Sequence, residues 1–282
     1  MAIREDRRPT LASWPKRIYN WNEVPARFRP ALDRWRDQGL PPENVTYIPK
    51  VHQYKKGMEY VTAWLGEEVL LLAGGDLGVK SLLVRPGDVA RMTYTIQLLR
   101  CSVEVLLGRG GETVTADFSY NRTKEDQLFP VLNLLLGNAP DHRPRTSHPA
   151  DPALERLQAD SYAMYNDAKL CYRFGETILD SLWVPGRNYG LQAFRKQRPE
   201  YFLGKLDRGV VAIQTDFYAR RTVYLTWDRL KEVAVKDAPF PGPGPRRRPA
   251  LVLETTCGGP VAVPLLPEQR TAAEAFAGRL QA

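Results

Sequence analysis

Two stretches of the sequence carry side chains suited to binding, and both are rich in cations. The first runs from Arg187 to Arg198 and continues toward Lys205 and Arg208. Guanidinium and ammonium groups contact phosphate oxygens, and arginine can do so through two parallel hydrogen bonds. This stretch is therefore the candidate anion-binding site, and its candidate residues are Arg187, Arg195, Lys196 and Arg198.

The second stretch, residues 51–60, combines ring, amide and ammonium groups just before a predicted strand. One interpretation is a small polar interaction surface made of His52, Tyr54, Lys55 and Lys56. The alternative is that Tyr54, Met58 and Tyr60 pack in the core while the lysines face water. The sequence leaves both interpretations open.

Residue types with catalytic chemistry do not form a recognisable constellation. The sequence has no Gly-x-x-x-x-Gly-Lys run, no Gly-x-Ser-x-Gly turn and no His-Glu-x-x-His motif. His142 and His148 fall in a proline-rich segment, which fixes ligands poorly for a metal. We predict no catalytic residue, no metal and no cofactor; an enzymatic site around His52 and Tyr54 is the remaining alternative.

The charge balance favours anionic partners without choosing among them. The 282 residues carry a formal net charge of +8 and a pI near 9.4, which attracts nucleic acid, anionic lipid or acidic proteins. A second basic cluster, Arg246–Arg248, follows a Pro/Gly run and is interpreted as a solvated hairpin tip. No regularly spaced row of aromatic residues supports base stacking.

Cysteine use and hydropathy indicate a cytoplasmic protein. Cys101, Cys171 and Cys257 are far apart and lie in apolar surroundings, so we expect buried, reduced thiols. The N-terminal residues are charged with no apolar region behind them, and no apolar run approaches the roughly 18 residues that span a bilayer.

Two runs of short strands, each followed by a helix, organise the chain. The first run falls between residues 44 and 137, with a hairpin at Gly66-Glu67-Glu68 and an amphipathic helix from Thr123 to Gly137. The second run begins at Thr177 and ends in a helix at residues 268–280. Predicted domains are a basic arm with a short helix (1–43), a first β domain (44–137), a Pro-rich linker with one connecting helix (138–175) and a second β domain (176–282).

One sequence pattern, called the phrase below, occurs in both runs. Lys80–Tyr94 and Arg221–Val235 each read as a strand, a polar turn with an aspartate, and a second strand. In this comparison Val89 corresponds to Leu230, and Met92 to Val233. Short strands joined without intervening helices predict antiparallel sheets.

This phrase and the order of strands followed by one helix resemble the bacterial pleckstrin-homology-like (PH-like) domains. The resemblance covers about residues 44–137 and 177–281, and Lys196–Arg198 resembles the Lys/Arg-x-Arg element of lipid-binding members of the wider fold. It implies an α+β, mainly β protein with two antiparallel PH-like barrels, each capped by a C-terminal helix. It also implies a scaffold without catalytic residues.

The sequence thus predicts a non-enzymatic interaction scaffold whose partner is a protein. The alternative is a peripheral module that binds an anionic lipid headgroup or nucleic acid through the basic loop 187–208. No small-molecule substrate is indicated.

Overall fold

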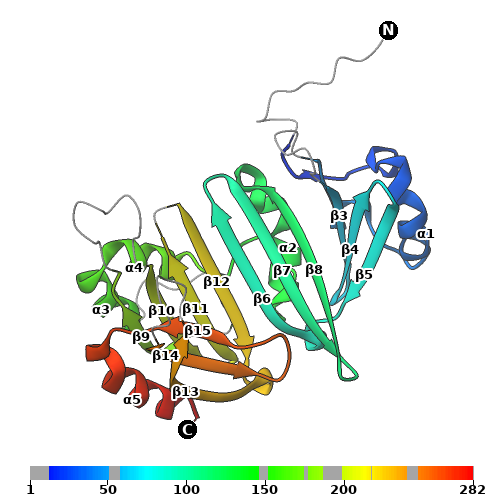
Figure 1. Cartoon of the computed structure of the whole chain (residues 1–282). Coiled ribbons are helices and arrows are strands. Elements are labelled where there is room, and N and C mark those ends of the chain that lie inside the picture. Colours follow the sequence, from blue (N-terminus) through cyan, green and yellow to red (C-terminus); the bar gives the residue numbers. More distant parts are fainter. Residues whose placement is uncertain are drawn as a thin grey trace. The chain divides into compact units, whose positions relative to one another are not determined.

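The computed structural model describes residues 13–50, 58–145, 152–174, 177–186, 199–216, 218–239 and 247–281 (Figure 1). The fold is α+β and mainly β, with antiparallel sheets. The chain divides into two compact units. The first contains Met1–Val89, Ile96–Arg109 and Val114–Arg145, and the second contains Ala90–Thr95, Gly110–Thr113 and Thr146–Ala282.

A five-stranded antiparallel sheet begins the first unit. Its strands follow one another in chain order: β1 (Lys16–Arg17), β2 (Val45–Ile48), β3 (Glu59–Leu65), β4 (Glu68–Gly75) and β5 (Gly78–Val84). The predicted hairpin at Gly66 is confirmed, and Gly66 turns the chain with a φ of 59° that favours glycine. No strand was predicted in the basic N-terminal arm, which is wrong at β1, because a two-residue strand has no sequence period of its own.

Helical segments cover this sheet. Helix α1 (Arg29–Asp37) follows the short turns η1 (Trp21–Glu23) and η2 (Ala26–Phe28), and Gly39 with a φ of 91° turns the chain just after its end. Alternate residues of β3 and β4, such as Val61 and Leu72, pack in one cluster with Leu32 of α1. Helix α2 (Phe129–Leu135) also contacts β3 and β4. Strands β3 and β4 are therefore buried on both faces, which explains their nearly continuous apolar runs.

The remaining elements between β5 and α2 are η4 (Pro86–Asp88), β6 (Val89–Gln97), β7 (Arg100–Arg109), β8 (Glu112–Asn121) and η5 (Arg122–Leu128). The side chain of Asn121 accepts a hydrogen bond from the N–H of Thr123 at 3.0 Å and starts η5. The α-helical part therefore begins later than predicted, with Pro130 in its first turn.

The second unit starts with α3 (Pro152–Asp160) and α4 (Tyr162–Lys169). We predicted one connecting helix here, which is wrong: Ser161 has an extended backbone, and its side chain accepts a hydrogen bond from the N–H of Met164 at 3.2 Å. Serine at this position caps a new helix because it satisfies an N–H that has no partner within the helix.

Four strands of the second unit follow the order β12-β11-β10-β9: β9 (Ile178–Val184), β10 (Glu200–Leu206), β11 (Gly209–Thr215) and β12 (Ala219–Thr226). Strand β10 lies inside the predicted basic loop 187–208, so the loop is shorter than expected. After η7 (Trp227–Arg229), a three-stranded sheet contains β13 (Leu230–Pro239), β14 (Arg247–Thr255) and β15 (Val261–Pro264). The turn η8 (Pro267–Gln269) then leads into α5 (Arg270–Gln281).

The expectation of two barrels is wrong, because these sheets are not closed. Other elements cover the apolar faces of the second sheet instead of barrel closure. Helices α3 and α4 contact β9, β10 and β11, whereas the opposite face packs with the three-stranded sheet and α5 around Phe276. An apolar face that is already covered gains nothing from curling on itself.

Three strands in each half of the chain start at a constant spacing. Strand β10 starts at Glu200, 141 positions (200 minus 59) after β3 starts at Glu59, and β11 and β12 keep the same spacing from β4 and β5. The repeated phrase forms a strand, a 3-10 turn and a strand in each half, and Val89 and Leu230 both close the turn. Val89 and Leu230 therefore occupy the same position relative to a 3-10 turn.

Candidate functional site

The predicted site residues fall in two equivalent connections. His52, Tyr54, Lys55 and Lys56 lie between β2 and β3, and Arg187, Arg195, Lys196 and Arg198 lie between β9 and β10. All eight are outside the described residues. The turn at Gly66 between β3 and β4 corresponds to the turn between β10 and β11, and not to the basic loop.

Two cations predicted to extend the basic loop belong to other contacts. Lys205 lies on β10 and donates a hydrogen bond to the carbonyl oxygen of Arg279. The guanidinium of Arg208 lies 5.9 Å from the centre of the Phe174 ring. Both side chains therefore stabilise the second unit beyond the end of the loop.

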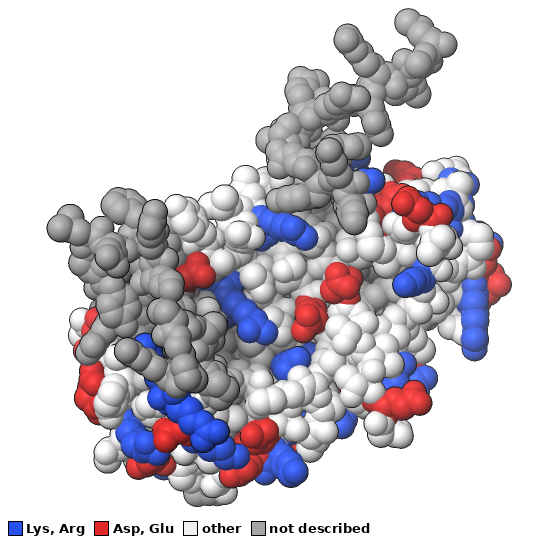
Figure 2. Space-filling view, viewed as in Figure 1, with Lys and Arg blue, Asp and Glu red and all other residues white. Residues whose placement is uncertain are grey.

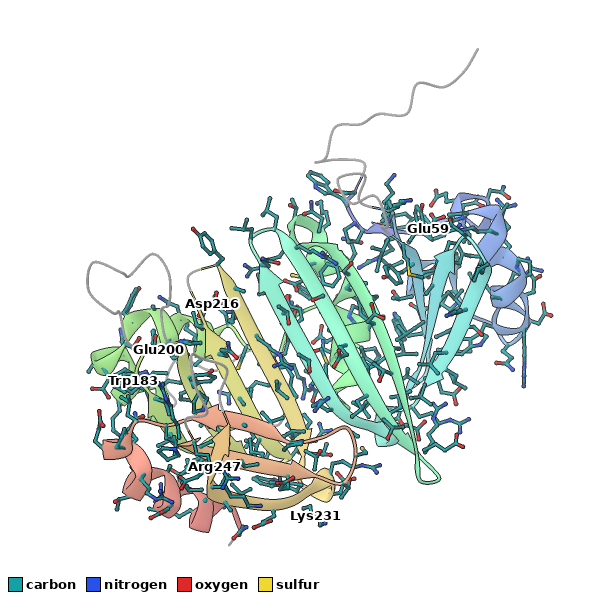
Figure 3. All side chains as sticks on the ribbon, viewed as in Figure 1. Glu59, Trp183, Glu200, Asp216, Lys231 and Arg247 are labelled. Carbon is teal, nitrogen blue, oxygen red and sulfur yellow. The ribbon has the colours of Figure 1, made fainter. Side chains whose placement is uncertain are left out.

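Each of the two connections ends at a hydrogen bond between an aromatic side chain and a glutamate. The hydroxyl of Tyr47 on β2 donates to Glu59. The indole N–H of Trp183 on β9 donates to Glu200 at 2.5 Å, and both of these residues are labelled in Figure 3. Tyr47 lies opposite Val61 and Trp183 lies opposite Phe202, which are equivalent positions. The pair is thus repeated although the aromatic residue differs.

The electrostatics of the two pairs differ. Arg27 forms an ion pair with Glu59, whereas no cation pairs with Glu200 among the residues that the structure describes. Burial, followed by the hydrogen bond and the charge of Glu59, raises the pKa of Tyr47, and Arg27 opposes this shift. Tyr47 therefore stays protonated at neutral pH and donates its hydroxyl hydrogen to Glu59.

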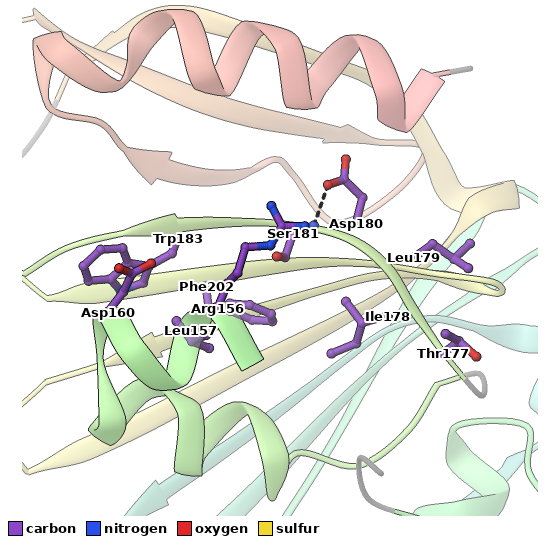
Figure 4. A pocket seen from close by; sticks show the side chains of 10 residues that line it. All are labelled: Arg156, Leu157, Asp160, Thr177, Ile178, Leu179, Asp180, Ser181, Trp183 and Phe202. Atoms are coloured by element: carbon purple, nitrogen blue, oxygen red, sulfur yellow. Dashed lines mark hydrogen bonds between the residues drawn. The ribbon is translucent and has the colours of Figure 1, made fainter. Parts of the chain in front are cut away.

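A groove runs along β9 in the second unit, between this strand and α3 (Figure 4). It holds a cavity of about 520 Å³. Its apolar wall includes Leu157, Ile178 and Phe202, and its polar lining includes Arg156, Asp160 and Ser181. An apolar wall with a few polar groups is typical of a binding site.

The edge of β9 beside this groove is protected by local polar contacts. Asp180 accepts a hydrogen bond from the backbone N–H of Ser181 at 2.8 Å, and its other carboxylate oxygen is 2.6 Å from Nε of Arg279 on α5. Leu179 is the extra residue of a bulge and is exposed. Edge charges and bulges hinder uncontrolled strand pairing.

A buried polar cluster lies where α4 packs on the sheet. Asp167 of α4 pairs with Arg220 at 2.9 Å and accepts a hydrogen bond from the hydroxyl of Thr215 at 2.7 Å. Burial raises the pKa of the nearby Cys171 thiol to about 11, although Arg173 and Arg220 oppose the shift. The thiol is protonated at neutral pH and is therefore a poor nucleophile. The contacts of Asp167 with Arg220 and Thr215 hold α4 against the sheet.

The prediction that the cysteines are buried is met in part. Cys101 and Cys171 are buried as expected, but Cys257 is only half-buried. Nδ1 of His142 lies 3.0 Å from the guanidinium of Arg17, whereas His148 is outside the described residues. Within the described ranges, no three metal-binding side chains gather at one point.

On the face drawn in Figure 2, basic and acidic side chains are interspersed. Arg247 and Arg248 of the second basic cluster belong to β14, where they pair with the end of β13. In the part of the chain that is described, no helix is both long and apolar enough to cross a membrane.

Comparisons with known proteins leave the site to be interpreted from its own geometry. No family model matches this chain, and no curated protein matches its sequence.

Proposed function

We propose that the protein is a non-catalytic interaction scaffold built from two PH-like domains. The groove between β9 and α3 is the observation that carries this proposal, because it combines an apolar wall, polar side chains and a strand edge. The order of four strands, a 3-10 turn, three strands and a helix recurs in both halves and supports the domain assignment. The proposal includes a protein partner and a cytoplasmic location.

The chemistry of the groove favours binding over catalysis. Its lining contains two carboxylates, Asp160 and Asp180, but Asp180 is engaged by Arg279 and Ser181.

Affinity capture from native cells tests the scaffold proposal. The full chain with an affinity tag is used as bait, and a variant with the groove filled, Ser181→Phe, is the matched control. We expect at least one protein to be enriched with the wild-type chain and depleted with the variant. Turnover of a small molecule by a preparation that enriches no protein would overturn the proposal.

A second candidate function is anion binding, and the equivalence of the two basic connections favours it. Lys55 and Lys56 in one half correspond in place to the cluster of Arg187, Arg195, Lys196 and Arg198 in the other. Flotation with anionic vesicles and a salt-titrated oligonucleotide shift separate lipid from nucleic acid. Replacing all six cations with glutamine should abolish retention; no retention of the wild-type chain at low salt removes this candidate.

A further inference from the structure

The two halves differ at one equivalent strand edge. In the first half β1 pairs with the outer edge of β2, with Lys16 opposite Tyr47 and Arg17 opposite Thr46. The backbone N–H of Ile18 extends this pairing by donating to the carbonyl oxygen of Val45 at 2.9 Å. In the second half the sheet order ends at β9, so no described strand occupies that edge.

Register identifies which residues of β9 would receive a strand. Val45 and Tyr47 lie opposite Ala63 and Val61, and Ser181 and Trp183 lie opposite the equivalent Gly204 and Phe202. Residues of an antiparallel strand alternate in the side toward which their N–H and C=O point. The backbone groups of Ser181 and Trp183 therefore point outward. The N–H of Ser181 donates to the Asp180 carboxylate until an added strand replaces this hydrogen bond.

The groove has room for a side chain from such a strand. Ile18 is 2% exposed and packs in the first half with Phe28 and Leu32 of its covering helical segment. On the equivalent side of β9, under α3, lies the cavity of about 520 Å³ with Leu157 and Phe202 in its wall (Figure 4). An added strand would bury an apolar side chain there without moving the core.

Charge adds a second element of recognition. Asp160 is exposed at the groove, and no cation of the described residues forms an ion pair with it. Two positions before Ile18, on the same side of the strand, the first half has Lys16. The equivalent residue of an added strand would lie opposite Trp183, which lines the groove together with Asp160.

We infer that the groove binds an extended peptide segment of a partner protein, which joins the sheet antiparallel to β9. The segment carries a cationic residue two positions before an apolar residue: the cation meets Asp160, and the apolar side chain enters the cavity. Backbone hydrogen bonds to Ser181 and Trp183 supply affinity, and the two side chains supply specificity. This inference rests on the proposed scaffold function and names the chemistry of the partner.

A peptide with the sequence of residues 13–20 is the probe, because it carries the Lys-x-Ile pattern already seen at an equivalent edge. It is titrated into the full chain while the indole N–H of Trp183 is followed by NMR, with Trp183→Phe used to assign the resonance. We expect a saturable shift of this resonance. N-methylation of the peptide isoleucine, which removes one backbone donor, and its replacement by aspartate should each weaken binding at least tenfold.

Groove variants locate the site on the protein. Ser181→Phe fills the cavity and should abolish binding, whereas Ser181→Ala keeps it open and should change affinity less than twofold. Asp160→Asn should weaken binding threefold or more at low salt and little at high salt. Each variant is compared with the wild type by its thermal transition, so a misfolded variant is recognised.

Several results would overturn the inference. No saturable shift at millimolar peptide would do so, as would equal binding by the wild type and Ser181→Phe. Concentration-dependent self-association that is lost in Ser181→Phe, without peptide binding, would show that a second copy occupies the edge. Affinity capture decides the scaffold proposal separately, because a captured partner can bind elsewhere.

Discussion

Glu59 and Glu200 occupy equivalent first positions of β3 and β10, and each accepts a hydrogen bond from an aromatic side chain of the preceding strand. The donor is a tyrosine in one half and a tryptophan in the other, so the hydrogen bond is repeated while the donor changes. Each pair ties the start of one strand to its neighbouring strand. The strands that adjoin both basic connections in the sequence are thereby held together.

Stability should fall at alkaline pH partly through Tyr47. Its pKa is raised in the folded state, by burial and by Glu59, above the value of about 10 in an unfolded chain. Its contribution is therefore present below about pH 10 and is lost as the pH rises further. Tyr47→Phe should make the decline in unfolding free energy between pH 9 and 11 shallower. Equal slopes for Tyr47→Phe and the wild type would contradict the assignment.

Breaking the buried ion pair under α4 should be costly. Arg220→Met leaves Asp167 without its cation in a site where the arginine side chain is only 9% exposed, and we expect a loss of about 3 kcal/mol in unfolding free energy. Arg270→Met breaks an exposed pair with Glu274 and should cost less than about 0.5 kcal/mol. Urea denaturation measures both; similar losses in the two variants would show that the buried pair has no special role.

The three thiols should react at different rates. Cys257 is half-buried, whereas Cys101 is buried and Cys171 is buried with a pKa of about 11. A maleimide at pH 7.5 should therefore label Cys257 first, and Cys171 should be modified only after denaturation. Mass spectrometry of a labelling time course checks this order. Early modification of Cys171 in folded protein would mean that α4 opens readily.

Gly209 should tolerate no side chain. A Cβ there would lie 1.9 Å from the carbonyl oxygen of Leu225 and 2.2 Å from the Phe174 ring, so Gly209→Ala must displace backbone as well as the ring. We expect a loss of about 3 kcal/mol. Gly278→Ala is the matched control, because it meets nothing within 4 Å on helix α5 and should stabilise the chain by about 0.5 kcal/mol. Thermal unfolding of the two variants in opposite directions is the expected result.

The local pattern of apolar and turn residues predicted those elements that neighbouring residues in the sequence determine. The hairpin at Gly66 and helix α1 were recognisable because turn residues bound short, regular apolar segments. Strand β10 was missed because a run of cations precedes its apolar residues, and β1 was missed because its existence depends on a partner strand about thirty residues away in sequence. The split between α3 and α4 depends on one capping serine within an otherwise helical pattern.

The candidate groove could not be predicted, because its lining comes from α3, β9 and β10, which only the fold brings together. The aromatic–glutamate pairs did leave a signal. Glu59-Tyr60, Leu65 and Val69 recur as Glu200-Tyr201, Leu206 and Val210 at the same spacing. Comparing the sequence with itself at that spacing would have aligned the two loops correctly. It would not have shown that an edge strand is present in one half only.

The two connections next to the aromatic–glutamate pairs differ in length, and this difference suggests how the protein can be engineered. Strands β3 to β5 and β10 to β12 start at matching positions, yet residues 49–58 separate β2 from β3, whereas residues 185–199 separate β9 from β10. The longer connection shows that this place in the sequence accommodates additional amino acids while β3 and β10 keep their equivalent starting positions. An epitope tag or fluorescent reporter inserted there would make the molecule visible in living cells while leaving both sheets intact.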